Sequence, residues 1–423
     1  MAFQQPGHGG KQTDRIDVIV PVYRGQAETL ACINSVLKAK VEAAHHLIVI
    51  NDASPEPSLT KALREHASRH GYTLLDNPEN LGFVGTVNRG MALSGDNDVV
   101  LLNADTEVSD GWLDRLKAAA YSGPRIATVT PLSNNATILS LPTAKGVDGI
   151  PYGLDLAGIN DLCRRENAGR TVDLPTAHGF CMFIRRDALH ELACSTPKPS
   201  ARVTARENDF SMRAATRGWR NLAACDVFVF PQGFGVVRGP LRARGRQPGE
   251  TGRNLSDYRG HVHRFIAADP MAAVRNRLQR WLWRDKHVVV FISLATGGGV
   301  TTNIDFLARK LTNEGYRVLI ARRAELASYA YEMAEWNGPG RLYYPAGDGI
   351  DSMCADILAL APAFIHVHHV IDLEDGMDRF LVASGIPYYV TCTTTSTCAR
   401  VLPCSMTAAN TAKCRISTPA IPA

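Results

Sequence analysis

Four short, almost wholly apolar runs recur in the first 105 residues, and a segment with helical spacing follows each of them. Strands that are apolar at nearly every position are typical of a parallel sheet that helices cover on both faces. The alternation therefore predicts an α/β fold with a mostly parallel sheet from residue 14 to about 130. The strands are expected at 16–23, 46–52, 72–77 and 98–105, and the helices at 28–39, 57–70, 84–94 and 110–120.

Polar residues stand where these apolar strands end. Asp52 and Asp105 each close a strand, and Pro21 and Tyr23 belong to the "PVY" that closes the first one. Parallel sheets bind ligands at the carboxyl ends of their strands, so we predict a ligand site at this edge. An aspartate after a strand also commonly caps the next helix or turn, and that alternative stays open for each of them.

A second strand–helix–strand pattern begins at about residue 286 with "HVVVFISLATGGGVTTNIDF". The three glycines at 297–299 allow either a ligand at a helix N-terminus or only tight packing of the helix on the strand. A later strand, "AFIHVHHVIDL", places His366 and His368 on one face and His369 on the other. Two alternating histidines without a third ligand make a metal site the less favoured interpretation.

Composition and length exclude several classes of protein. The 423 residues are enough for two or three domains, and no apolar run approaches the ~18–20 residues of a membrane span. The opening "MAFQQPGHGGKQTD" lacks the apolar core of a signal peptide and predicts a disordered lead-in over 1–13. We therefore expect a cytoplasmic protein whose ten cysteines are reduced and mostly buried.

The net charge of +5 is concentrated in three atypical segments. Residues 193–206, 231–254 and 393–423 carry +3, +4 and +3, so the rest of the chain carries −5. Because the surplus is confined to these segments, it does not indicate nucleic-acid binding. The second segment holds six glycines, three prolines and five arginines in 24 residues, a composition that predicts irregular structure.

A frame shift explains these segments physically. GC-rich coding sequence read out of frame tends to give Arg, Gly, Pro, Ala and Thr. When codons are written for each segment and shifted by one base, they encode amphipathic sequences with balanced acidic and basic residues. The shifted sequence of the second segment begins with a histidine at the position of Pro231. We interpret the three segments as out of frame, with a natural basic insertion at each place as the alternative.

Five motifs in the first half together resemble the family 2 glycosyltransferases, whose Rossmann-like nucleotide-sugar fold is called GT-A. The resemblance extends over about residues 14–270. The motifs are "VIVPVYRG" (18–25), "VINDAS" (49–54), "NLGFVGTVNRGM" (80–91), "LLNADTEV" (101–108) and "ENDFSMRAATRGW" (207–219). Each motif alone is a weak signal, whereas the ordered set is specific.

The resemblance implies roles for the nucleotide-binding residues. Asp52 would hydrogen-bond the nucleobase, and Pro21 and Tyr23 would lie in the same nucleotide-sugar site. A further group would lie against the nucleotide, namely Gly82, Asn88 and Gly90.

The resemblance also implies a metal and a base. Asn103 and Asp105 stand where the family has its Asp-x-Asp, which holds Mg²⁺ or Mn²⁺ on the diphosphate, and Asp105 is the expected metal ligand. In inverting members a later carboxylate deprotonates the acceptor hydroxyl. We assign that role to Asp209, with Glu207 second. The alternative is that Asp209 only forms an ion pair with Arg213 one helical turn later.

The segment 286–391 resembles the N-terminal part of a GT-B glycosyltransferase, the fold with two Rossmann-like domains. The predicted domain order is therefore a lead-in (1–13), a GT-A domain (14–270), a helical linker (271–285), this partial GT-B N-terminal Rossmann-like domain (286–391) and an irregular tail (392–423). The predicted protein transfers a sugar from a nucleotide-diphosphate donor to a glycan or lipid-linked glycan in polysaccharide biosynthesis, with inversion. It would bind no nucleic acid and would contact a membrane only peripherally. The alternative is an inactive remnant or a non-catalytic nucleotide-sugar-binding protein.

Overall fold

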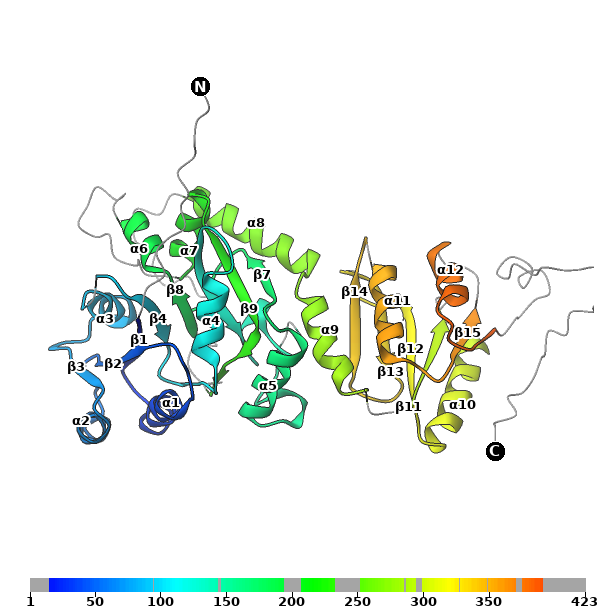
Figure 1. Ribbon diagram of the computed structural model, residues 1–423, viewed down its shortest axis with the longest axis horizontal. Coiled ribbons are helices and arrows are strands. Elements are labelled where there is room, and N and C mark those ends of the chain that lie inside the picture. The colour runs from blue at the N-terminus through cyan, green and yellow to red at the C-terminus, as the bar shows by residue number, and fades with distance from the viewer. Residues whose placement is uncertain are drawn as a thin grey trace, which may run out of the picture. The chain divides into compact units, whose positions relative to one another are not determined.

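The structure is a computed structural model, and Figure 1 shows it as a ribbon. Its chain divides into two compact units, one up to Val274 and the other from Arg275. The residues that it describes are 15–93, 95–143, 146–193, 207–232, 252–284, 287–293, 299–326, 328–347, 349–369 and 375–390. Among these residues, no helix is both long and apolar enough to cross a membrane.

An eight-stranded sheet forms the centre of the first unit, with strand order β3-β2-β1-β4-β8-β6-β9-β7. The pairs β1–β2, β2–β3, β1–β4 and β6–β9 are parallel, whereas β8 and β7 run antiparallel to their neighbours. The strands are β1 Ile16–Val22, β2 His45–Asn51, β3 Thr73–Asp76, β4 Asp98–Leu102, β6 Ile126–Leu132, β7 Thr171–Leu174, β8 Cys181–Ile184 and β9 Arg220–Phe228. Two short strands, β5 Thr106–Glu107 and β10 Phe230–Pro231, pair beside it. The predicted mostly parallel α/β sheet is confirmed.

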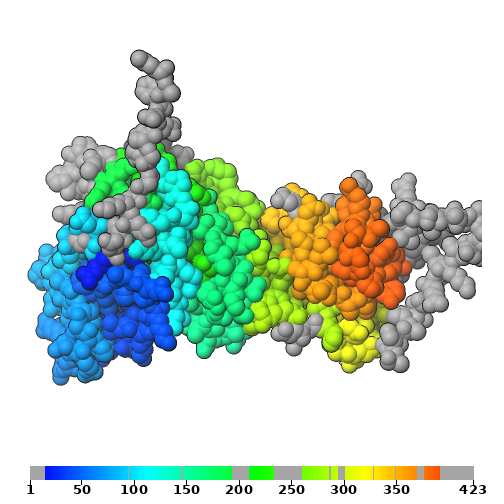
Figure 2. Space-filling model, viewed as in Figure 1, coloured from blue at the N-terminus to red at the C-terminus, as the bar shows by residue number. Residues whose placement is uncertain are grey.

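Helices cover both faces of this sheet, as expected for strands that carry apolar side chains on both faces. Buried side chains of α1, α2 and α4 pack on one face of the sheet, and those of α3, α6 and α7 pack on the other. The helices are α1 Gln26–Lys38, α2 Pro57–His70, α3 Gly82–Met91, α4 Trp112–Ala120, α5 Leu156–Glu166, α6 Arg186–Ala193, α7 Glu207–Thr216 and α8 Gly252–Ala268. Short 3-10 turns lie at Thr137–Leu139 and Pro151–Gly153. In the space-filling view, the residues of β1 to α2 gather at the lower left in shades of blue (Figure 2).

Local sequence signals explain several helix ends. Helix α2 begins at Pro57, whose fixed φ suits the first helical position, and Gly71 caps its end with a left-handed φ of 74°. Asp155 caps α5 by accepting a hydrogen bond from the Gly158 backbone nitrogen at 2.7 Å. Helix α3 begins two residues earlier and ends three residues earlier than the predicted 84–94.

The second unit has a six-stranded sheet with strand order β14-β13-β12-β11-β15-β16. Strands β12, β11, β15 and β16 are parallel, and β13 and β14 add an antiparallel hairpin. The strands are β11 His287–Ser293, β12 Tyr316–Arg323, β13 Tyr329–Glu335, β14 Arg341–Pro345, β15 Ile365–His369 and β16 Tyr388–Val390. The helices are α10 Gly299–Asn313, α11 Gly349–Leu360 and α12 Asp375–Ala383. Helix α9, Ala272–Trp281, includes the division between the units and lies in the predicted linker.

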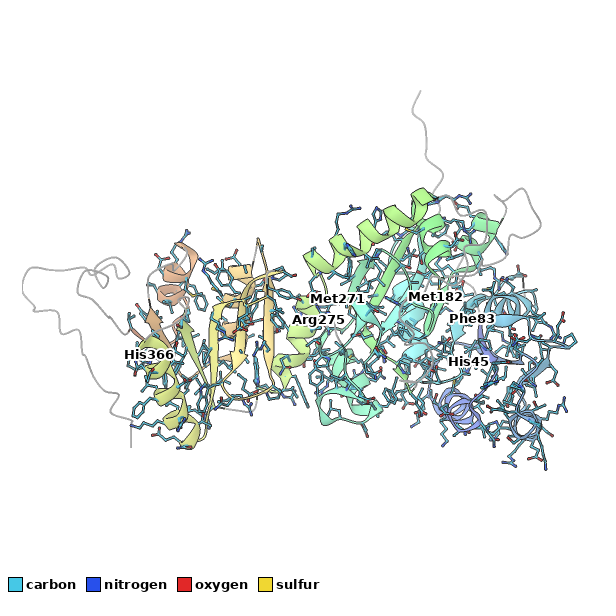
Figure 3. All side chains as sticks on the ribbon, turned by 180° about the vertical axis from the view of Figure 1, so that it is seen from behind. His45, Phe83, Met182, Met271, Arg275 and His366 are labelled. Atoms are coloured by element: carbon cyan, nitrogen blue, oxygen red, sulfur yellow. The ribbon has the colours of Figure 1, made fainter. Side chains whose placement is uncertain are left out.

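His366 and His368 of β15 share a face, as their spacing predicts. Their rings are tilted by 30° with centroids 4.0 Å apart, and Phe291 packs against both (His366 is labelled in Figure 3). Phe291 belongs to the core under α10, together with Ile304 and Ala308. Helices α11 and α12 pack on the opposite face.

Most of the three atypical segments lies outside the described residues, as do the predicted lead-in and the glycines at 297 and 298. The ends of the second segment are described, and they are regular. Pro231 lies in β10, and α8 already begins at Gly252. The predicted irregularity is therefore wrong at both ends, because β10 pairs with β5 and the helical pattern of the following residues extends back to Gly252.

Candidate functional site

The carboxyl ends of β1, β2 and β4 meet at one edge of the first sheet. Val22 is paired with Asn51 across β1 and β2, and Ile19 is paired with Leu101 across β1 and β4. Because all three strands run in the same direction, the segments that follow them emerge together. Asp52 follows β2 directly, and the segment 103–105 follows β4. Both predicted carboxylates therefore stand at this edge.

The Asp52 carboxylate is buried, with 4% of the residue exposed, and one of its oxygens has a structural role. Oδ1 accepts hydrogen bonds from Asn77 Nδ2 at 2.7 Å and from the Leu81 backbone nitrogen at 2.8 Å. The other oxygen, Oδ2, receives no hydrogen bond from any residue that the structure describes. Asp52 thus fixes the loop before α3 with Oδ1 and keeps Oδ2 for another partner.

The loop of residues 77–81 is also tied to α3. Asn77 Nδ2 donates to Thr86 Oγ1 at 3.0 Å, and Arg89 donates to the Asp76 carbonyl at 2.8 Å and to Asn77 Oδ1. The loop between β3 and α3 is therefore fixed by hydrogen bonds both to Asp52 at the end of β2 and to side chains of α3.

The three predicted nucleotide contacts on α3 differ in position. Gly82 has a φ of 69°, which favours glycine, and the space around it is open. Asn88 Nδ2 is buried without a hydrogen-bond partner among the described residues, so a ligand atom would satisfy it. Gly90 instead faces the sheet, where an added Cβ would lie 2.8 Å from Ile19 Cγ2 and 3.0 Å from Ile50 Cδ1. In this structure Gly90 allows close packing of α3 on the sheet. Its contact with the nucleotide stays a prediction.

Apolar side chains are exposed around Asp52. Tyr23 after β1, Leu81 in the loop and Phe83 on α3 are 41%, 42% and 39% exposed (Phe83 is labelled in Figure 3). The Arg24 guanidinium lies 5.4 Å from the centre of the Tyr23 ring. Pro21 is half-buried within β1. The edge therefore offers exposed aromatic and aliphatic surface beside a buried carboxylate.

Asp105 lies in a tight turn after β4. The strand ends at Leu102, three residues before the predicted end at 105. The Thr106 backbone nitrogen donates to the Asn103 carbonyl at 3.1 Å, and the Asn103 nitrogen donates to the Phe180 carbonyl at 3.0 Å. From α1 below, Cys32 Sγ donates to the same Asn103 carbonyl at 3.4 Å. Burial raises the pKa of Cys32 to about 12, which keeps it a thiol. The turn is therefore fixed while its polar side chains remain half-buried.

Position 231 lies next to this turn. Strand β10 pairs antiparallel with β5, so that Pro231 is opposite Thr106 and Phe230 is opposite Glu107. The Gln232 backbone nitrogen donates to the Asp105 carbonyl at 2.7 Å. The residue at which the shifted reading has a histidine is therefore a direct neighbour of the predicted metal ligand.

The oxygen atoms of the turn suit a hard divalent cation. Thr106 Oγ1 donates to Asp105 Oδ1 at 3.3 Å, and within the described parts of the chain no group donates to Asp105 Oδ2 or to the Asn103 side chain. One carboxylate and one amide oxygen match the ligands of Mg²⁺ and Mn²⁺, which keep several water or phosphate ligands. No group of three His, Cys, Asp or Glu side chains among the described residues is arranged to hold a metal. The residues therefore fit a cation held jointly with a phosphate ligand.

The predicted base lies at the beginning of α7. Asp209 is exposed, and its Oδ2 accepts from Arg213 Nε at 2.8 Å, which is the ion pair considered as the alternative to a catalytic role. Glu207 is the first residue of α7, and its side chain lies outside the described part of the structure. The helix is tied to the loop before β8, because Ser211 Oγ accepts from the Ala177 backbone nitrogen at 3.0 Å.

Sequence reasoning missed His178 in this same loop. Its backbone nitrogen donates to Thr130 Oγ1 at 3.4 Å, and its Nε2 is buried without a partner among the described residues. Burial lowers the pKa of His178 to about 4, so the imidazole is neutral. The only signal in the sequence is a lone histidine just before the apolar strand "CMFI", which predicts nothing by itself.

Comparison with known proteins gives a family for part of this unit. Residues 17–193 match the family described as Glycosyl transferase family 2. This segment thus matches a family 2 glycosyltransferase domain, and the resemblance seen in the motifs is confirmed for it. The fusion to a GT-B domain and the frame shifts remain predictions.

Individual relatives are more distant. A segment of 119 residues is 30% identical to the Drosophila melanogaster protein described as polypeptide N-acetylgalactosaminyltransferase 13, and it covers 26% of this chain and 21% of that protein. The match thus spans about a fifth of that relative. Two solved structures also align, a mannosyltransferase from Pyrobaculum calidifontis in complex with GDP-Man and Mn²⁺ and GalNAc-T7 with UDP, GalNAc and Mn²⁺. The first has 15% identity and a TM-score of 0.37 over 72% of this chain and 81% of that one. The second has 14% identity and a TM-score of 0.41 over 79% of this chain and 68% of that one.

Proposed function

We propose that this chain transfers a sugar from a nucleotide-diphosphate donor to a hydroxyl of a glycan or lipid-linked glycan acceptor, with inversion at the anomeric carbon. The observation that carries the proposal is the meeting of Asp52 and the Asn103–Asp105 turn at one sheet edge, within the segment that matches glycosyl transferase family 2. The acceptor would belong to polysaccharide biosynthesis in the cytoplasm, with at most peripheral contact to a membrane.

The nucleotide would bind around the free oxygen of Asp52. That oxygen can accept a hydrogen bond from an N–H of the base while Oδ1 continues to hold the loop. The Tyr23 ring offers a flat surface for the base, and Asn88 Nδ2 offers an unpaired donor.

The diphosphate would lie at the turn after β4, where Asp105 and the Asn103 amide oxygen would hold Mg²⁺ or Mn²⁺. When bound, the cation would neutralise the charge that develops on the departing nucleoside diphosphate. Asp209, or Glu207 beside it, would accept the proton of the acceptor hydroxyl. The acceptor oxygen then bonds to the anomeric carbon as the bond from that carbon to the diphosphate oxygen breaks.

A second candidate, a nucleotide-sugar binder without transferase activity, is favoured by two observations. Pro231 occupies the position opposite Thr106 where the shifted reading has a histidine, so a possible cation ligand is missing. Asp209 is also engaged with Arg213, which a base would have to leave. This candidate binds the donor but does not transfer its sugar.

The test measures binding of UDP and GDP by calorimetry with Mn²⁺ and with EDTA. We expect EDTA to weaken binding of the preferred nucleotide at least tenfold, and Asp105→Ala to remove the dependence on Mn²⁺. Asp173→Ala is the matched control, because Asp173 is exposed on the outer strand β7 and pairs only with Arg220 among the described residues. Equal affinity with and without metal in the wild type would refute the assignment of Asp105.

Activity separates the two candidates. Release of nucleoside diphosphate from a panel of nucleotide sugars, with and without added glycan acceptors, reports transfer. Binding without turnover would identify the non-catalytic binder. Turnover that appears only in Pro231→His would show that the missing cation ligand is what silences the site.

A further inference from the structure

The loop before β8 lies between the two ends of the candidate site. Phe180 accepts from Asn103 of the cation turn, and Ala177 donates to Ser211 of α7, the helix that carries the candidate base. His178 lies between these anchors, and its own nitrogen donates to Thr130 near the end of β6. Phe180 is two positions after His178 in the sequence, a reach of at most ~7 Å along the chain.

The side chain of His178 has an unmet hydrogen bond. Its Nε2 is buried, and no described residue pairs with it. A buried polar atom without a partner is costly and uncommon in folded proteins, so such an atom indicates a ligand or a water. His178 was not assigned any role from the sequence motifs.

The charge state of His178 limits the kind of ligand. Burial lowers the pKa of the imidazole to about 4, so it carries no positive charge at neutral pH. A phosphate is best bound by charged groups or by several backbone N–H donors. A sugar hydroxyl both donates and accepts, and it therefore pairs well with a neutral imidazole.

We propose that Nε2 of His178 hydrogen-bonds a hydroxyl of the transferred sugar in the nucleotide-sugar donor. The inference rests on the proposed function, because only a donor bound at Asp52 and Asp105 places its sugar between the cation turn and α7. His178 then distinguishes a nucleotide sugar from the nucleoside diphosphate that remains after transfer.

The test compares affinities for nucleotide sugars and for the matching diphosphates, with UDP-GalNAc, UDP-glucose and GDP-mannose against UDP and GDP in the presence of Mn²⁺. In His178→Phe, which keeps a ring and removes the hydrogen bond, we expect affinity for the nucleotide sugar to fall about 2- to 10-fold. Affinity for the diphosphate should change less than twofold. His178→Gln, which keeps a polar group, should recover part of the loss.

His45→Phe is the matched control, because His45 is also half-buried and lies at the amino end of β2 (labelled in Figure 3). It should leave both affinities unchanged.

If His178→Phe weakens binding of the diphosphate and of the nucleotide sugar equally, His178 is structural and the inference is wrong. If neither affinity changes in a variant that keeps the wild-type melting temperature, the inference is also wrong. Should the wild type bind neither class of ligand, the proposed function fails and the inference fails with it, whereas failure at His178 alone leaves that function standing. If His178→Phe does not fold, His178→Gln decides by the same comparison.

Discussion

Asp52 is expected to have two separable functions, and the substitution Asp52→Asn separates them. The asparagine can keep an oxygen at the position of Oδ1, where Asn77 and the Leu81 nitrogen donate at 2.7 and 2.8 Å. It then places an NH₂ group at the position of Oδ2. The loop should therefore stay in place while an acceptor for the nucleobase becomes a donor.

The magnitudes follow from these two hydrogen bonds. Hydrogen bonds to a charged acceptor contribute about 1.5–3 kcal/mol and neutral ones about 0.5–1.5 kcal/mol, so Asp52→Asn should lower the free energy of unfolding by about 1–3 kcal/mol. Asp52→Ala removes both bonds and leaves buried donors unpaired, at a cost of about 3–5 kcal/mol. Loss of the contact from Oδ2 to the base should weaken nucleotide binding about 10- to 100-fold in both variants.

Urea denaturation of wild type, Asp52→Asn and Asp52→Ala measures stability, and calorimetric titration with UDP and GDP in Mn²⁺ measures binding. The expected pattern is two different losses of stability with a similar loss of affinity. Wild-type affinity in Asp52→Asn would refute the assignment of Oδ2 to the nucleobase. Equal destabilisation of the two variants would refute the structural role of Oδ1.

Two further predictions concern the base and the second unit. Asp209→Asn should reduce the rate of sugar transfer by a factor of ~10²–10⁴ and leave donor affinity unchanged. Because the ion pair between Asp209 and Arg213 lies at the surface, the free energy of unfolding should change by less than about 1 kcal/mol. A parallel loss of donor binding would show that Asp209 binds the donor instead. Burial lowers the pKa of His366 to about 4 and of His368 to about 3, so the unfolded chain takes up more protons than the folded one below pH ~6.5. The second unit should therefore lose about 1–2 kcal/mol per imidazole between pH 7.5 and 5 in urea denaturation, and His368→Leu should reduce that loss; an unchanged pH dependence in this variant would contradict the burial argument.

Four strands of the first sheet, β1 to β4, and the edge at which they end could be predicted from the sequence. Runs such as "IDVIVPV" (16–22) are apolar throughout because both faces are covered, and that pattern is local. The convergence of Asp52 and Asp105 followed from strand direction alone. The antiparallel strands β7 and β8 were not predicted, because each has only four residues and no distinctive period.

The rest of the site depends on contacts that no local pattern encodes. The turn at 103–105 ends β4 early, where the Thr106 nitrogen donates to the Asn103 carbonyl, and Asn103 is itself held by Phe180, 77 residues later. Gly90 was assigned to the nucleotide by resemblance, whereas its closest neighbours are Ile19 and Ile50 of the sheet. His178 was missed because its Nε2 becomes buried without a partner, among the described residues, only in the folded chain.

The close packing of α3 on the sheet has a consequence for engineering donor specificity. The segment 77–91 is fastened at one end through Asp52 and at the other through the gap that Gly90 leaves over Ile19 and Ile50. A loop transplanted from another enzyme would lack the matching residues at 19, 50 and 52, which position this segment on the sheet. Exchange of donor preference should therefore require a cassette that moves 77–91 together with matching residues at 19, 50 and 52.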